Sequence, residues 1–124
     1  MAHYIDGFVF PIPRDRLTEY TRLALAAAEI WKEHGALDYL EYVGDDMTLE
    51  GTRSFVDLVA ATEDETIVFG WVVFDSREAR DLANKKVAAD PRMAFDFSNS
   101  GFDAKRMAYG GFQLLIPSSH ANPG

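Results

Sequence analysis

The sequence predicts an α+β fold in which two helices cover one face of a mainly antiparallel sheet. Residues 66–74 (TIVFGWVVF) form an apolar run without alternation, which is typical of a central strand that is covered on both faces. A helix with its own start signal follows this run directly, and an amphipathic helix occupies residues 14–34. The element order predicts a ferredoxin-like βαββαβ unit with an extra hairpin strand.

Length and composition point to one domain over residues 1–124, with 117–124 as a loose tail. A net charge of −8 disfavours binding to nucleic acid or to an anionic membrane surface. The absence of cysteine excludes disulfides, thiolate metal sites and a cysteine nucleophile. No secretory signal is visible, and the longest apolar stretch is far short of the roughly 20 residues that a membrane helix needs. We therefore expect a soluble, cytoplasmic protein.

The first half of the chain predicts two strands around a helix. Residues 4–10 (YIDGFVF) are aromatic and β-branched, as in strands, and Pro11 and Pro13 are expected to end them. Pro13 suits the first position of a helix that ends at His34, because Gly35 supplies a left-handed stop. Residues 37–43 have the mixed polarity of an edge strand. The stripe of the helix expected to face inward is Leu17, Tyr20, Ala24, Ala27, Ala28 and Trp31.

The second half predicts a hairpin, a helix and a last strand. Residues 53–60 form a moderate strand, which an acidic turn at 63–65 joins to the central strand. Asp75 is expected to cap the next helix, with Glu78 three residues on. A further turn runs through Phe97, and residues 105–116 form the last strand. The inward stripe of this second helix is predicted to be Ala79, Leu82, Ala83 and Val87.

Two glycines suggest which face of the sheet the helices cover. Gly7 and Gly70 are expected on the helix side, where backbones come close. A large apolar patch then faces away from the helices, and a second copy of the chain would bury it in a two-fold homodimer around a cavity. Alternatively, the extra strand and the tail cover this face in a monomer. The patch comprises Tyr4, Asp6, Phe8, Phe10, Phe69 and Trp71.

Four ordered blocks of sequence resemble the YbaA-like family of small bacterial proteins of unknown function. They are DGFVFPIP (6–13), WKEHGALDYLEYVGDD (31–46), FGWVVFDSREARDLANKKVAADPRM (69–93) and FDAKRMAYGGF (102–112). The chain departs from the family at Phe10, commonly Leu, and at Ala104, commonly Gly. The resemblance implies a dimeric α/β-barrel fold and homodimerisation, and it carries over no catalytic residues. Cofactor-free monooxygenases and isomerases share that superfamily, but fold alone says little about chemistry.

Asp6, His34 and Tyr109 are the candidate catalytic residues. A desolvated Asp6 within an aromatic strand would accept a proton; alternatively it forms an ion pair with Lys105 or Arg106 on the last strand. His34 lies at a helix C-terminus, where the helix dipole stabilises its cation, so a functional role requires it to line the cavity beside an acid.

The candidate ligand-binding residues are Phe8, Phe69, Trp71, Arg106 and Gln113. Trp71 and Tyr109 could stack on a flat ligand, Tyr109 could donate to an oxyanion, and Gln113 could orient it. Alternatively these aromatic residues pack in the core or the dimer, and Gln113 faces solvent. The sequence has no histidine pair with metal-ligand spacing, no phosphate-binding glycine loop and no nucleophile elbow, so we expect no metal and no cofactor.

These observations favour a small-molecule-binding homodimer with its cavity on the sheet face that lies away from the helices. One alternative is an enzyme of the cofactor-free monooxygenase or isomerase type. The other is a non-catalytic dimer that binds another protein. The sequence does not decide whether the chain is an enzyme.

Overall fold

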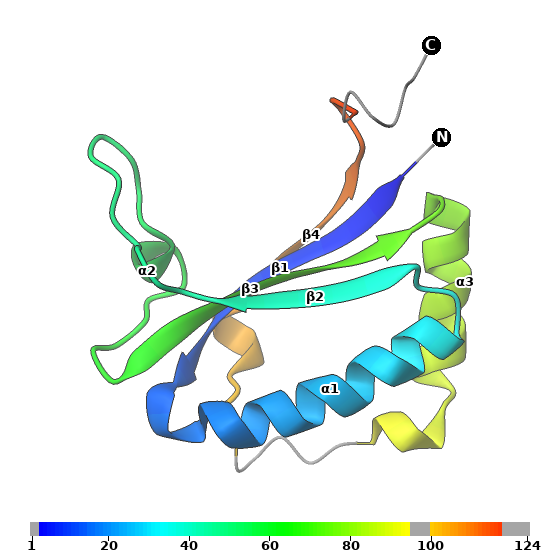
Figure 1. Cartoon of the computed structure of the whole chain (residues 1–124), viewed down its shortest axis with the longest axis horizontal. Coiled ribbons are helices and arrows are strands. Elements are labelled where there is room, and N and C mark those ends of the chain that lie inside the picture. Colours follow the sequence, from blue (N-terminus) through cyan, green and yellow to red (C-terminus); the bar gives the residue numbers. More distant parts are fainter. Residues whose placement is uncertain (1–2, 95–99, 118–124) are drawn as a thin grey trace.

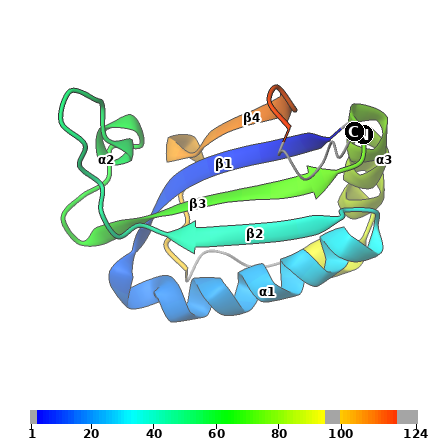
Figure 2. The ribbon, with the colours of Figure 1, turned by 45° about the horizontal axis from the view of Figure 1, so that its top comes forward.

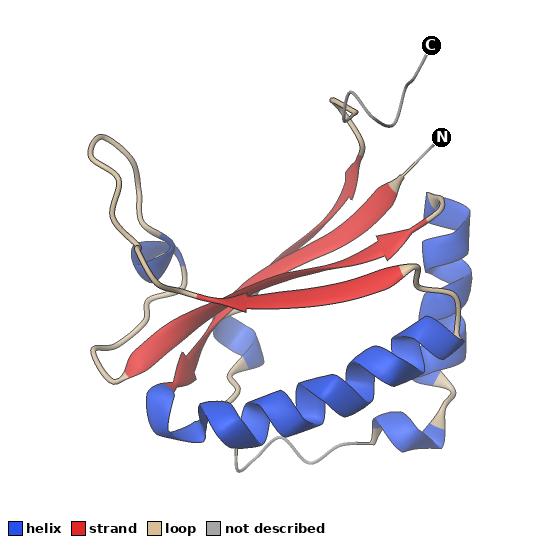
Figure 3. Ribbon diagram, in the orientation of Figure 1, coloured by secondary structure: helices blue, strands red, loops and turns tan. Residues whose placement is uncertain are grey.

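The computed structural model describes residues 3–94 and 100–117 and confirms the predicted α+β class (Figure 1). Four strands form one antiparallel sheet in the order β2-β3-β1-β4. Helices α1 and α3 lie together on one side of this sheet (Figures 1 and 3). The elements are β1 (Tyr4–Pro13), α1 (Leu17–Glu33), β2 (Asp38–Val43), α2 (Phe55–Leu58), β3 (Glu65–Phe74), α3 (Arg77–Ala88) and β4 (Ala108–Gln113), with 3₁₀ turns at Arg14–Arg16, Pro91–Met93 and Ala104–Arg106.

The even-numbered residues of β1 face the helices and form much of the core. Phe10 is 2% exposed and Ile12 is fully buried, and both pack with Tyr20 of α1. Tyr4 packs with Phe74 and with Ala83 of α3. The prediction that Tyr4, Asp6, Phe8 and Phe10 point away from the helices is therefore wrong.

The prediction is wrong because it places both Gly7 and Gly70 on the helix side of the sheet. Gly7 pairs with Trp71, whereas Gly70 pairs with Phe8, so the two glycines lie on opposite faces of the sheet. Only Gly70 faces the helices, and a Cβ placed there would lie 2.7 Å from the Phe8 ring. Gly70 thus leaves the space that the Phe8 ring occupies.

Phe69 and Trp71 point to the opposite face, as predicted, and this face is only partly covered. Phe69 is 39% exposed, and Tyr42 and Phe112 are each more than half exposed. The single chain alone does not cover both faces of β3, so that expectation depends on the predicted second copy. Helix α2 lies near one end of the sheet, away from α1 and α3 (Figures 1 and 2).

The predicted extra strand at residues 53–60 is wrong, because this segment contains the short helix α2. The Ser54 side chain accepts a hydrogen bond from the backbone N–H of Val56, which is a helix N-cap arrangement. The four residues of α2 form one helical turn, and Ala60 follows it with a positive φ of 53°. A serine cap outweighs the moderate strand propensity here.

Several predicted boundaries shift in the structure. Strand β1 continues through Pro11 and Pro13, because β4 pairs with β1 only as far as Val9, and proline is tolerated where an edge is open. Ser76 rather than Asp75 caps α3, accepting from the N–H of Ala79. Strand β4 covers only the middle of the predicted 105–116. The turn through Phe97 and the tail from 118 to 124 lie outside the described residues.

Substitution of Gly70 by Ala is expected to destabilise the fold by about 1–3 kcal/mol, because the new methyl group overpacks the interior. Its Cβ would meet the Leu40 carbonyl oxygen at 2.6 Å and Glu41 Cγ at 2.9 Å. Gly7→Ala is the matched control, since its Cβ would meet Phe112 at an ordinary 3.4 Å. Urea unfolding measures the free energy of unfolding of both variants, and equal values would contradict the assignment of the two faces.

Candidate functional site

A cavity of about 510 Å³ lies between the sheet and the two long helices. It lies on the helix side of the sheet, opposite to the face where the sequence predicted a cavity. Its walls come from every strand of the sheet, from α1 and α3, and from the connection between α3 and β4. The lining residues are Asp6, Phe8, Phe10, Tyr20, Ala27, Trp31, Tyr39, Val72, Asn84, Met93, Phe102, Met107 and Tyr109.

Asp6 anchors the polar end of this cavity. Its side chain is 8% exposed, and its Oδ1 accepts hydrogen bonds from Arg80 Nη1 at 2.8 Å and from the Tyr109 hydroxyl at 2.7 Å. Arg80 also donates to the Tyr4 hydroxyl at 3.0 Å, and its guanidinium lies 4.9 Å from the centre of the Tyr4 ring. One buried ion pair therefore joins β1 to α3, and two tyrosines complete it.

The second oxygen of Asp6, Oδ2, accepts no hydrogen bond from the described residues, because both donors bind Oδ1. Burial and the hydrogen bond to Asp6 raise the pKa of Tyr109 to about 12, so the phenol keeps its proton at neutral pH. Asp6 Oδ2 is an acceptor, and the Asn84 amide at the cavity wall supplies both a donor and an acceptor.

Aromatic rings form most of the remaining wall. The Phe8 ring stacks on Phe10 with centroids 6.1 Å apart and tilts against Tyr39 at 6.4 Å. Trp31 meets Phe74 edge to face. Two methionines complete the wall, and their flexible side chains adapt to irregular shapes. The site thus combines flat apolar surfaces with the Asp6 carboxylate and the Tyr109 hydroxyl that is hydrogen-bonded to it.

The structure brings together only part of the predicted site. Asp6, Phe8 and Tyr109 all line the cavity. Phe69 and Trp71 lie on the opposite face of the sheet, where they contact each other edge to face. Gln113 is exposed at the end of β4, where its side chain is free to face solvent.

Arg106 is not the partner of Asp6, and Lys105 is exposed. Arg106 forms a two-pronged ion pair with Glu65, with N–O distances of 2.8 and 2.7 Å, and it also binds Asp103. The hydrogen bond from Arg106 lowers the pKa of Glu65 to about 2. The general prediction of an ion pair at Asp6 holds, but its partner comes from α3 rather than from the last strand.

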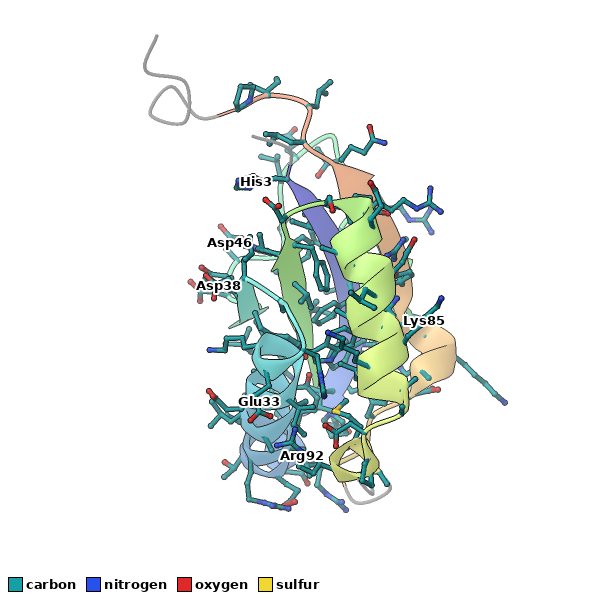
Figure 4. The ribbon with its side chains drawn as sticks, turned by 90° about the vertical axis from the view of Figure 1, so that its right-hand side faces the viewer. His3, Glu33, Asp38, Asp46, Lys85 and Arg92 are labelled. Carbon is teal, nitrogen blue, oxygen red and sulfur yellow. The ribbon has the colours of Figure 1, made fainter. Side chains whose placement is uncertain are left out.

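His34 has a structural environment at the end of α1. Its Nε2 lies 2.8 Å from Asp90 Oδ2, and the Asp90 side chain also binds Arg92. Arg92 reaches back to Glu33 with a separation of 2.6 Å, so these residues tie the end of α1 to the turn after α3 (Figure 4). His34 is beside an acid but is not among the residues that line the cavity.

Arg80 is the main residue that the sequence reasoning missed. It lies three and seven residues before the buried Ala83 and Val87, on the same face of α3. This spacing, together with the need of Asp6 for a cation, could have identified it. The predicted inward residue Leu82 is instead 53% exposed.

Metal-binding clusters and helices able to span a membrane are both absent from the described residues. Among residues 3–94 and 100–117, no three His, Asp or Glu side chains gather closely enough to hold a metal ion. Within the same residues, no helix is both long and apolar enough to span a membrane.

Residues 3–104 match the model of a family described as "Protein of unknown function (DUF1428)". The chain is 42% identical over 113 residues to the "Uncharacterized protein YbaA" of Escherichia coli strain K12, covering 91% of this chain and 97% of the relative. The Shigella flexneri protein of the same name matches equally well. An uncharacterised NIPSNAP domain protein from Burkholderia xenovorans has a TM-score of 0.48 at 14% identity, covering 94% of this chain and 95% of that one. That structural likeness is too weak to bear on fold or function, whereas the sequence matches confirm the resemblance seen in the four blocks.

Proposed function

Because the chain belongs to the DUF1428 family of proteins of unknown function, we propose its function from its own geometry. It binds a small, flat and largely apolar molecule in the cavity between the sheet and the helices. The ligand donates one hydrogen bond to Asp6. The observation that carries this proposal is a cavity of about 510 Å³ with aromatic walls and a carboxylate side chain, only 8% exposed, in its lining.

The size and lining of the cavity support small-molecule binding. Ligand pockets typically have volumes of roughly 300–1,000 Å³ and mostly apolar walls with a few converging polar groups. The polar groups here are Asp6, Tyr109 and Asn84, and they come from three different elements of the fold.

The charges at the site favour a neutral hydrogen-bond donor. The positive charge of Arg80 is balanced by Asp6, and none of the described Lys or Arg residues lines the cavity. An anionic ligand therefore finds no unpaired cation on the described wall. A phenol or an indole N–H, by contrast, can stack on the rings and donate to Asp6 Oδ2.

The ion pair also bears on the enzymatic alternative. Cofactor-free oxidation or isomerisation would use Asp6 as the proton acceptor. The contacts of Asp6 with Arg80 and Tyr109 match the ion-pair interpretation more closely than that role. Binding is therefore the function that the geometry supports best.

We also propose that a second copy of the chain packs on the open face of the sheet. The strand order matches that of a ferredoxin-like unit, which leaves one face of its sheet without helices. Tyr42 stacks on Trp71 there, and Phe69 contacts Phe55 of α2. An apolar surface of this kind, formed mainly by one sheet, suits a two-fold interface in which each copy covers the other.

Filling the cavity should weaken binding without unfolding the chain. Ala27 lines the cavity and Ala26 next to it is exposed, so Ala27→Leu and Ala26→Leu form a matched pair. We expect Ala27→Leu to weaken the affinity for 4-ethylphenol about tenfold or more, which corresponds to ~1.4 kcal/mol. Ala26→Leu should bind like the unmodified chain.

The two tryptophans report where the probe binds, since the chain contains only Trp31 and Trp71. In ¹H–¹⁵N spectra, 4-ethylphenol should shift the indole signal of Trp31 and leave the indole signal of Trp71 unchanged. The Trp71→Phe variant identifies which signal belongs to Trp71. 4-Ethylanisole, which lacks the hydroxyl hydrogen-bond donor of 4-ethylphenol, should bind more weakly. A shift of Trp71 alone, or equal affinity of the two alanine variants, would refute the proposed site.

Sedimentation equilibrium at micromolar concentration tests the homodimer. The chain should sediment as two copies, and Phe69→Glu should give single chains because it places a charge in the apolar interface. Leu82→Glu adds the same charge at an exposed position of α3 and should leave the dimer intact. A single-chain particle for the unmodified protein would rule out the homodimer.

A further inference from the structure

A second cavity of about 290 Å³ opens between α1 and the edge strand β2. Its walls are mainly apolar, with Leu17, Ala24 and Leu25 from α1 and Val43 from β2. Among the described residues that line it, Glu41 is the only carboxylate, and none is a Lys or Arg. The cavity is therefore a small apolar groove with one acidic group.

Glu41 is held in place by two phenols. The Tyr20 hydroxyl donates to Oε1 at 2.5 Å and the Tyr39 hydroxyl donates to Oε2 at 2.9 Å. A carboxylate has about four lone-pair positions, so each oxygen keeps one acceptor position. Both donors are neutral, and none of the described Lys or Arg side chains forms an ion pair with Glu41.

The environment of Glu41 makes its negative charge costly. Burial raises the pKa of Glu41, and the hydrogen bonds from Tyr20 and Tyr39 oppose this shift only in part. Burial and the neighbouring carboxylate likewise raise the pKa of both tyrosines, so both remain hydrogen-bond donors. A partly buried carboxylate without a cation is stabilised when a positive group enters and pairs with it.

We propose that this groove binds an organic ammonium group with a short alkyl chain, and that Glu41 is its counter-ion. The ammonium occupies the open acceptor positions of the carboxylate, which Tyr20 and Tyr39 hold in a fixed orientation. The alkyl chain lies along the apolar wall of α1. This site rests on the second cavity alone and does not depend on a ligand in the larger one, although Tyr20 and Tyr39 contribute to both walls.

The negative charge of the whole chain assists such a ligand. The net charge is −8, so cations are enriched near the surface in general. A specific site must therefore be distinguished from general attraction. Glu29 supplies the control, because it lies on α1 with its side chain 78% exposed.

The test measures the binding of n-butylammonium and of neutral 1-butanol to three proteins by calorimetry and by chemical-shift changes. The unmodified chain and Glu29→Gln should bind n-butylammonium equally, whereas Glu41→Gln should lose at least tenfold in affinity. The neutral alcohol should bind all three weakly. Thermal unfolding of Glu41→Gln should occur at or above the temperature of the unmodified chain, since the substitution removes a partly buried charge and keeps an acceptor for the phenols.

Three results would overturn the proposal. The first is that 1-butanol and n-butylammonium bind the unmodified chain with equal affinity. The second is that Glu41→Gln binds n-butylammonium as tightly as the unmodified chain. The third is that Glu29→Gln loses as much affinity as Glu41→Gln, which would indicate general attraction. None of these results bears on binding of 4-ethylphenol in the larger cavity, so the two proposals fail separately.

Discussion

The ion pair between Asp6 and Arg80 is the constraint on which the arrangement of this chain depends. A carboxylate on the covered face of a central strand needs a cation, because an unpaired charge in that position costs several kcal/mol. Arg80 supplies it from α3, and Tyr4 and Tyr109 fix the geometry of the pair. The pair therefore determines which face of β1 the helices cover, and it places a polar group at the end of an otherwise apolar cavity.

The cavity itself follows from the sizes of the side chains that meet between the layers. Helix α1 places Ala27 at the wall of this cavity and Ala24 and Ala28 at the wall of the second one, and small side chains leave space beneath a helix. On the sheet, Gly70 lets the Phe8 ring lie close to the backbone of β3. The rings of Phe8, Tyr39 and Trp31 then border the space rather than fill it.

Local patterns predicted much of the fold, while the assignment of faces required contacts that are distant in sequence. The two long helices, the edge character of β2 and the central position of β3 follow from periodicity and from capping residues. The parity of β1 does not, because Gly7 and Gly70 carry the same local signal and lie on opposite faces. Arg80 was missed since a charged helical residue usually faces water. The residues predicted to form one site were consequently divided between two faces, with Asp6, Phe8 and Tyr109 on one and Phe69 and Trp71 on the other.

A double-mutant cycle between Asp6 and Arg80 tests the central claim most directly. The stabilities of Asp6→Asn, Arg80→Gln and the double variant should give a coupling of about 2 kcal/mol or more, as expected for a buried charge pair. The exposed pair of Arg77 and Asp81, 3.9 Å apart on the same helix, should give a coupling below about 0.5 kcal/mol. A coupling near zero between Asp6 and Arg80 would show that β1 does not turn this carboxylate toward α3, and the assignment of the cavity to the helix side would be wrong.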